Sequence, residues 1–305
     1  MTNASAMTAL SSLQATNKSL EMTQTRISTG FRVASASDNA AYWSIATTMR
    51  SDNKALSTVK DALGLGAAKV DTAYTGMNAA IDVVDEIKAK LVASREPGVD
   101  KTKIQAEITQ LQDQLSSIAS SASFSGENWL SVDSSAANYN ATKSIVSSFT
   151  RAADGSVSVG TLTINADNLK LFDANGNIGI LDTESTTTNG AVVYSVSTLS
   201  ISAYTNTAAD LADLDEMIDT VDTALQTMIS RAGDIGAAKS RIDMQMDFVN
   251  DLTDAIDRGI GTLVDADMNE ESTRLQALQV QQQLGIQALS IANGSVQTIM
   301  SLFRS

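Results

Sequence analysis

Four oxygen-bearing side chains in the middle of the sequence have a spacing that could bind calcium. Asp173, Asn175 and Asn177 alternate along the chain, and Glu184 follows eleven residues after Asp173, as the ligands of a calcium-binding loop do. However, Ile178 occupies the position where such a loop needs glycine for its sharp turn. We therefore interpret this segment as a polar turn in a β-hairpin and predict no metal site.

Nothing else in the sequence supports an active site. The chain contains no histidine and no cysteine, so the commonest general base and the thiolate nucleophile are both missing. Carboxylate pairs such as Asp85-Glu86 and Asp213-Asp215 could support acid–base chemistry. Both pairs fall between the apolar positions of predicted helices, which places them on a solvent-exposed face. We therefore predict that the protein is not an enzyme and binds no cofactor.

The charge of the chain restricts its partners. The formal net charge is −14, which argues against a nucleic-acid partner because proteins that bind phosphates present a basic surface. The charge is uneven: residues 1–60 carry six basic and three acidic side chains, whereas residues 205–262 carry four basic and twelve acidic ones. No apolar run is long enough to span a membrane, and no Sec-type signal is visible. Composition alone would therefore predict a cytosolic protein.

Long amphipathic helices are expected at both ends of the chain. In the N-terminal segment, alternating steps of four and three residues mark a heptad-like stripe at Ala6, Leu10, Leu13, Asn17, Leu20, Gln24, Ile27 and Phe31. The C-terminal segment carries a matching stripe at Leu275, Leu278, Gln282, Gly285, Leu289, Ala292, Val296, Ile299 and Phe303. Polar residues within such stripes can fix the register of a coiled coil. We therefore predict that the two ends pair with each other.

The inner part of the chain keeps the same helical period. Apolar stripes run along residues 77–91, 104–118 and 211–263, as is typical of long helices that bury one face. The chain has a single proline, and a near-absence of proline permits helices of this length. Pro97-Gly98 predicts a turn between the first two stripes, and Thr102 with Gln105 predicts a capping box at the start of the second.

Residues 131–204 have a different composition, because Ser, Thr, Asn and Gly dominate and the helical period is lost. Short alternating runs at Ser156–Val159 and Val192–Ile201, with a turn at Asn175-Gly176, predict strands. The predicted fold class is therefore mainly α. We expect a folded-back rod of long helices, with a terminal coiled coil, an inner helical bundle and a small β-rich insertion at the tip.

Four stretches together resemble bacterial flagellins. Residues 26–41, which read RISTGFRV and then ASDNAA, are similar to the N-terminal signature of that family. Residues 104–110 (IQAEITQ) are close to the consensus of its second inner helix, and residues 124–130 (FSGENWL) resemble the segment before its variable region. Residues 278–304 resemble its Gln- and Ala-rich C-terminal helix. In detail, residues 37–50 and 263–273 look most like flagellins of rhizobia and related soil α-proteobacteria, which build complex filaments from several related subunits.

The resemblance implies a function that composition does not show. The chain would be the structural subunit of the flagellar filament and would self-assemble into a helical tube that acts as a propeller for swimming. It would be exported without a Sec signal peptide, through the flagellar type III export apparatus and with an export chaperone, to an extracellular location. Its partners would be itself, related flagellins, and the hook-associated and cap proteins, with no nucleic acid and no membrane.

The resemblance also implies a division of the chain. Residues 1–40 and 263–305 would form the terminal coiled coil and the inner tube of the filament, residues 41–130 and 205–262 the outer tube, and residues 131–204 the variable surface domain. The predicted subunit interface consists of the apolar members of the two terminal stripes: Leu10, Leu13, Leu20, Ile27, Phe31, Leu275, Leu278, Leu289, Val296, Ile299 and Phe303.

Two other functions fit parts of the sequence. A hook–filament junction protein shares flagellin-like ends, and a generic coiled-coil scaffold would share the heptad-like stripes. Residues 124–130 and the long match at the C-terminal end favour a flagellin over both.

Overall fold

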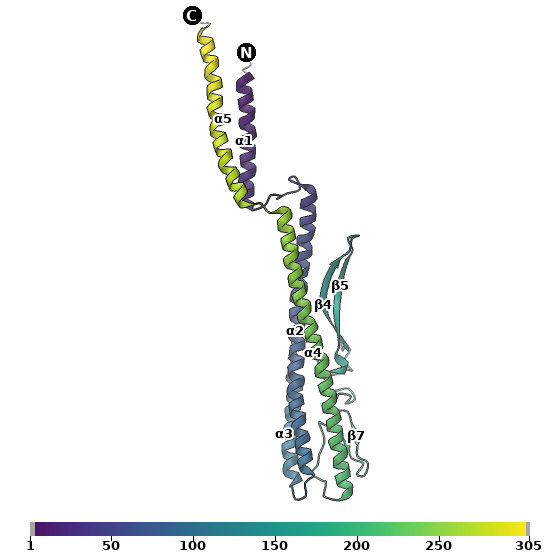
Figure 1. Cartoon of the computed structure of the whole chain (residues 1–305). Helices are drawn as coiled ribbons and strands as arrows, with labels where there is room; N and C mark the ends of the chain where they lie inside the picture. Colours follow the sequence, from purple (N-terminus) through teal and green to yellow (C-terminus); the bar gives the residue numbers. More distant parts are fainter. Residues whose placement is uncertain (1–3, 303–305) are drawn as a thin grey trace. The chain divides into compact units, whose positions relative to one another are not determined.

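The computed structural model describes residues 4–302, and describes side chains as far as residue 294 (Figure 1). Its helices are α1 (Ala4–Thr29), α2 (Ala40–Ser94), α3 (Lys101–Ser121), α4 (Ala208–Val264) and α5 (Met268–Leu302). Helices of 55 and 57 residues, α2 and α4, are possible because Pro97 lies outside them, in the turn before α3. The mainly helical fold with paired terminal segments and a small β insertion is confirmed.

The chain divides into two compact units. The terminal unit contains the two ends of the chain, as far as Lys54 and from Leu252 onward, and the central unit runs from Ala55 to Asp251. The terminal unit therefore holds α1, α5, the first turns of α2 and the last turns of α4. The threefold division of the chain stated above stays a prediction.

The apolar stripes of the inner helices form the core of the central unit, as the helical period predicts. On α2 the buried side chains include Met77, Val84, Ile87 and Leu91; on α3, Ile104, Ile108 and Leu115; on α4, Leu214, Val221, Met228 and Ile235. The steps within each set are three, four or seven residues, so each helix buries one continuous face. The buried faces are rich in Leu, Ile, Val and Met, in keeping with the low aromatic content of the chain.

The turn between α2 and α3 is confirmed, but the predicted capping box is wrong. Gly98 has a positive φ of 91° after Pro97, and the N–H of Val99 donates to the carbonyl of Glu96, as in a tight turn that requires glycine at its third position. The N-cap of α3 is Asp100, whose side chain accepts from the backbone N–H groups of residues 102 and 103. Gln105 instead bonds to the insertion: its Oε1 accepts from the N–H of Ile201 at 2.8 Å.

The insertion contains short strands and one longer hairpin. Strands β4 (Thr142–Arg151) and β5 (Val157–Asn165) pair antiparallel, with an irregularity between Val146 and Ser148. The other strands are two residues each: β1 (Ser123–Phe124), β2 (Glu127–Asn128), β3 (Ser131–Val132), β6 (Phe172–Asp173), β7 (Ser185–Thr186) and β8 (Val193–Tyr194), with a 3₁₀ turn at Ala166–Asn168. Pairs β1–β2 and β7–β8 are antiparallel, and β3–β6 is parallel.

Two predictions for the insertion need correction. The turn at Asn175-Gly176 exists, but it does not close a hairpin, because β6 before it pairs with β3 instead. Within Val192–Ile201 only Val193–Tyr194 is a strand. The alternation there reflects burial of Tyr194, Val196, Leu199 and Ile201 by an irregular segment, and carbonyls of this segment accept from Gln112 on α3.

The insertion does not stand apart from the helices as a tip; it packs along them. On α2, a Cβ added to Gly66 would meet the Ile145 side chain of β4 at 2.4 Å, so glycine is required for this close approach. On α3, Gln105 Nε2 donates to the carbonyl of Leu199 at 3.3 Å. On α4, Thr220 shares a hydrogen bond with the Tyr194 hydroxyl. The insertion is thus part of the central unit's core.

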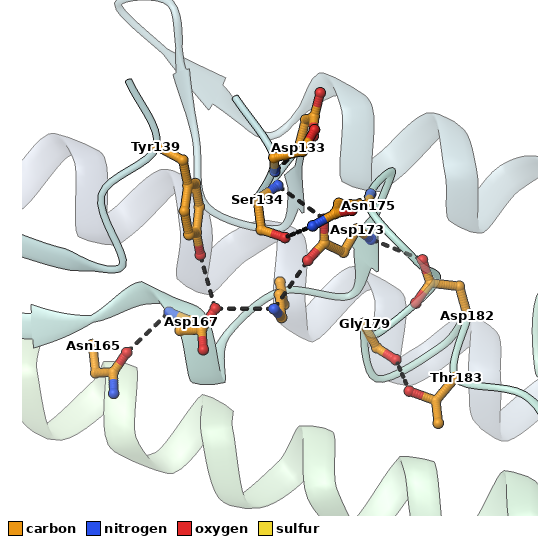
Figure 2. Close-up of polar contacts among 12 residues, drawn as sticks. Asp133, Ser134, Tyr139, Asn165, Asp167, Asp173, Asn175, Gly179, Asp182 and Thr183 are labelled. Carbon is orange, nitrogen blue, oxygen red and sulfur yellow. Dashed lines mark hydrogen bonds and ion pairs between the residues drawn. The ribbon is translucent and has the colours of Figure 1, made fainter. Parts of the chain in front are cut away.

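Asp173, the first residue of the calcium-like pattern, lies in a network of hydrogen bonds and ion pairs (Figure 2). The buried Lys170 Nζ lies 3.0 Å from Asp173 Oδ2 and 2.9 Å from Asp167 Oδ1, which also accepts from the Tyr139 hydroxyl. Asp173 accepts further from the backbone N–H of Ser134. Although burial opposes ionisation, these donors hold the pKa of Asp173 below its usual range. Of the four residues that resembled a calcium loop, Asp173 therefore belongs to an internal ion pair, whereas Asn175, Asn177 and Glu184 are exposed.

A second ion pair ties the hairpin to α2 and yields a test. Glu127 bridges Lys69 on α2, at 2.6 Å, and Lys143 on β4, at 2.8 Å. Although burial opposes its ionisation, the two ammonium groups lower the pKa of Glu127 to about 2. Because the pKa in the folded chain is depressed, the stabilisation is present above the unfolded value of about 4.3 and is lost as the pH falls through about 2.

We expect Glu127→Gln to lower the free energy of unfolding of the soluble chain by about 1–2 kcal/mol at pH 7, because the pair is partly exposed and screened. Urea titrations at pH 7 and at pH 3 measure this, and the difference between variant and parent should shrink at pH 3. Glu184→Gln is the control, since Glu184 is an exposed carboxylate that also lies between α3 and α4. Equal destabilisation by both variants would contradict the role of the bridge.

Candidate assembly surface

The turn between α1 and α2 explains why the signature at residues 26–41 has its composition. Gly30 ends α1 with a positive φ of 74°, and the N–H of Gly30 donates to the carbonyl of Arg26, which is the left-handed helix end that glycine favours. Asp38 accepts from the backbone N–H groups of Ala34 and Ser35. Asn39 accepts from the N–H groups at the start of α2. These contacts fix the loop between α1 and α2.

The loop is held against the other end of the chain within the terminal unit. The N–H of Arg32 donates to the carbonyl of Val264 at 2.7 Å, and the N–H of Ala266 donates to the carbonyl of Gly30 at 2.9 Å. Beneath these bonds, Val33, Ala46, Ile260 and Val264 form a small buried cluster against which Phe31 packs. The joints before α2 and after α4 therefore fold as one piece.

Helices α1 and α5 pair antiparallel (Figure 1). Arg26 Nη1 lies 2.9 Å from Glu271 Oε1, Gln282 donates to Asn17 at 2.8 Å, and a Cβ on Gly285 would meet Leu13 at 3.1 Å. From Arg26 to Leu13 the chain is followed backwards along α1, while the partners run forwards along α5 from Glu271 to Gly285, as in an antiparallel pair. The predicted pairing of the two ends is present in the terminal unit.

On α5 the predicted stripe is the face that meets α1. Leu275, Leu278, Gln282, Gly285, Leu289 and Ala292 are all partly shielded, whereas most residues between them are exposed. Val296 and Ile299 lie in the last turns of α5, where the structure describes no side chains, and Phe303 lies outside the described residues. The heptad-like period of the C-terminal stripe therefore matches the described part of the pair.

On α1 the stripe is half right. Ala6, Leu13, Leu20 and Ile27 are partly shielded as predicted, but Leu10, Asn17 and Gln24 are exposed. At these three positions the residue one place earlier is shielded instead: Ala9, Thr16 and Thr23. Thr23 is the one fully buried residue of α1 among those described, at 2% exposure. Small side chains at these positions let the two helices approach closely, and hydrophobicity alone could not have found them.

Glu271 is a residue that the sequence analysis missed. It is 5% exposed, and its Oε1 accepts from Arg26 at 2.9 Å and lies 3.5 Å from Arg274 Nη1. A glutamate in the first turn of α5 also interacts favourably with the helix dipole. The sequence does not predict that Glu271 is buried, because its partner Arg26 is 245 residues away.

The outer faces of the pair expose large apolar side chains. Leu284 is 57% exposed and Ile291 is 73% exposed on α5, with Val280 and Ile286 close to these values; on α1, Met7, Leu10 and Met22 are exposed. A two-helix pair cannot cover these side chains, because each helix has apolar residues on more than one side. Large apolar patches on a protein surface mark sites of interaction.

The two carboxylate pairs that could have supported acid–base chemistry differ in their exposure to solvent. Asp85 and Glu86 are exposed, as predicted. Asp213 is buried, so its predicted place on a solvated face is wrong: its carboxylate accepts from the backbone N–H groups of Asn189 and Gly190 at 2.9 and 2.7 Å. It therefore anchors a loop of the insertion to α4.

Neither a metal-binding cluster nor a membrane span is found in the described part of the chain. No group of three or more His, Cys, Asp or Glu side chains there is arranged to hold a metal ion. None of its helices is both long and apolar enough to cross a membrane.

Comparison with known families covers most of the chain. Residues 1–135 match the bacterial flagellin N-terminal helical region, and residues 218–303 match the bacterial flagellin C-terminal helical region. Residues 136–217, which lie between the two matches, include the hairpin and the irregular segments of the insertion.

Full-length relatives are similar over the whole chain. Flagellin C of Rhizobium meliloti (strain 1021) is 54% identical, and the alignment covers all of this chain and 98% of that protein. Flagellin A of the same strain is 49% identical, with coverage of 100% and 99%, and a flagellin of Brucella melitensis is 47% identical, with coverage of 100% and 98%. The crystal structure of Bacillus cereus flagellin is 18% identical, with a TM-score of 0.40, and covers 63% of this chain and 88% of that one.

Proposed function

This chain belongs to the bacterial flagellin family and is a structural subunit of the extracellular flagellar filament, not an enzyme, and from that premise we propose that the outer faces of α1 and α5 join neighbouring subunits. The resemblance to rhizobial flagellins is confirmed. Membership of the flagellin family implies that the chain polymerises with itself into a filament. What remains to be assigned is the role of each terminal residue in that polymer.

The exposed apolar side chains of the terminal pair carry the proposal. Leu284, Ile286 and Ile291 on α5, and Met7 and Leu10 on α1, are between 45% and 73% exposed in the described part of the chain. Burial of such side chains against a neighbouring pair removes apolar surface from water, worth about 25 cal/mol per Å². Since every subunit repeats the contact, even a modest gain at each interface favours a long polymer.

The predicted interface residues then have different roles. Leu13, Leu20 and Ile27 with Leu275, Leu278 and Leu289 hold the two helices of one subunit together. Leu10 faces outward and contacts a neighbouring subunit. Phe31 belongs to the joint before α2, where it packs on the buried cluster and beneath the Arg50 guanidinium, 5.0 Å from the ring centroid. Val296, Ile299 and Phe303 extend the stripe toward the C-terminus.

The remaining parts of the proposal rest on family membership. Residues 1–40 and 263–305 form the inner tube, residues 41–130 and 205–262 the outer tube, and residues 131–204 the outer surface. The chain leaves the cell through the flagellar type III export apparatus with an export chaperone, and meets the cap and hook-associated proteins at the filament ends. Related flagellins are further partners, since one species, Rhizobium meliloti, has flagellins A, B, C and D that are similar to this chain.

The outer face of α5 can be tested without disturbing the pair. Leu284→Asp and Ile286→Asp place a charge on a surface that is already exposed in one chain, so the soluble protein should keep its helix content. In the polymer the same charge would be buried without a partner, at a cost of several kcal/mol at every subunit. We expect loss of filaments, measured by high-speed pelleting and electron microscopy.

Ile178→Asp is the matched control, because Ile178 is 55% exposed and lies in the insertion. That variant should form filaments of normal length. Normal filaments from Leu284→Asp and Ile286→Asp would mean that the outer face of α5 is not an assembly surface. Leu289→Asp should differ from both by disrupting the α1–α5 pair itself.

The buried Glu271 gives a second test. Glu271→Ala removes the acceptor that joins Arg26 to α5, and a charged hydrogen bond of this kind contributes about 1.5–3 kcal/mol. We expect filaments that depolymerise at a temperature several degrees lower than the parent, followed by circular dichroism and light scattering on heating. Glu270→Ala is the control, since Glu270 is exposed and its carboxylate pairs with Arg274 on the same helix. If both variants melt alike, Glu271 has no special role in the pair.

A further inference from the structure

Helix α4 exposes an apolar pair that the terminal helices do not explain. Met244 is 60% exposed and Phe248 is 58% exposed, one helical turn apart in the central unit. Asp247 and Asp251 are exposed on the same side of the helix, and Asp243 is exposed at its edge. We call Asp243, Met244, Asp247, Phe248 and Asp251 the acidic patch.

The surroundings of the acidic patch are also mostly acidic. Arg241 is an exposed cation at its border, and the nearby Lys239 is already paired with Asp71 at 2.5 Å. Three aspartates against one exposed arginine leave this surface with negative charge around an apolar centre. Such a centre with a charged rim has the composition of a protein-binding site.

The start of α2 presents the opposite combination in the terminal unit. Trp43, Thr47, Arg50 and Lys54 follow one another at steps of four, three and four residues, so they share one helix face. All four are exposed, Trp43 at 37%. Arg50 stacks on Phe31 on one side. The half-buried Asp52 is the acidic residue of this stretch. We call Trp43, Thr47, Arg50 and Lys54 the basic patch.

Building on the polymerisation proposed above, we propose that the acidic patch of one subunit docks on the basic patch of a second copy of this chain. The charges are complementary, since Asp247 and Asp251 face Arg50 and Lys54 across the contact. The apolar centres also match, because the thioether of Met244 and the ring of Phe248 pack on Trp43 with the favourable geometry of sulfur–aromatic and aromatic pairs. Trp, Phe, Met and Arg are the residues enriched in protein interfaces.

The contact is heterologous, which suits a filament. Each copy carries one patch of each kind, so a copy that uses its acidic patch still offers its basic patch to the next. A contact of this kind does not close into a dimer and propagates as a helix. The opposite charges also accelerate encounter and disfavour contacts between two acidic or two basic patches.

Crosslinking tests the contact directly, because the chain has no cysteine of its own. Filaments of the double variant Thr47→Cys with Met244→Cys, treated with a short bis-maleimide, should give a ladder of dimers, trimers and higher multimers on denaturing gels. A mixture of the two single-cysteine chains should stop at dimers. Thr47→Cys with Ile178→Cys is the control and should give no ladder.

Charge reversal gives a second, independent readout. Arg50→Glu with Lys54→Glu, and separately Asp247→Lys with Asp251→Lys, should each raise the critical concentration for polymerisation about tenfold or more, since like charges would meet. The chain that carries all four substitutions restores opposite charges and should polymerise close to the parent value. Circular dichroism of the soluble variants verifies that each keeps its helix content.

The outcomes separate this inference from the proposed function. A ladder and rescue by the fourfold variant support the contact. Filaments of normal length from both charge-reversed pairs, or filaments without crosslinks, overturn it and mean that another partner covers these patches, while polymerisation through α1 and α5 still stands. Rescue that fails although every variant folds also overturns it. If Leu284→Asp polymerises normally but the ladder forms, the contact stands and the terminal-face proposal is wrong.

Discussion

The close pairing of α1 with α5 is the contact on which the proposed assembly of this protein depends. The seam is narrow, because Ala9, Thr16 and Thr23 occupy alternate positions on α1 and Gly285 faces Leu13 from α5. A narrow seam brings the helices close but buries few large side chains. The large ones, such as Leu284 and Ile291, are therefore left outside. In the assembly that we propose, further copies of the chain cover these outward-facing side chains.

How far the sequence predicts this structure depends on which signal each element carries. The inner stripes are confirmed because a face of Leu, Ile, Val and Met repeats with the helical period, and burial follows from that pattern alone. The stripe of α1 is half wrong because its partner selects small residues, so Thr23 is buried while Leu10 is exposed. Hydrophobicity alone would predict that Leu10 is buried and Thr23 exposed. Which of the two is buried depends on the geometry of the helix pair.

The insertion shows a second limit of sequence patterns. Asp173 was a candidate for calcium, and Asp213 for a solvated face, because a carboxylate's partner is rarely its neighbour in sequence. In the structure Asp173 accepts from the backbone N–H of Ser134, 39 residues away, and Asp213 accepts from that of Gly190, 23 residues away. Buried carboxylates need such partners, since an unpaired buried charge is costly. Long-range partners of this kind are set by tertiary contacts, so local spacing could not predict them.

Charge is distributed along this chain in a way that composition alone undervalues. A net charge of −14 opposes the close approach of identical subunits. However, residues 1–60 are basic on balance and residues 205–262 are strongly acidic. Segregated charge converts a uniform repulsion into attraction between unlike regions of neighbouring copies, provided that the contact is heterologous. The exposed faces of Trp43 and Phe248 lie within these two regions, so apolar burial and charge favour the same arrangement of neighbours.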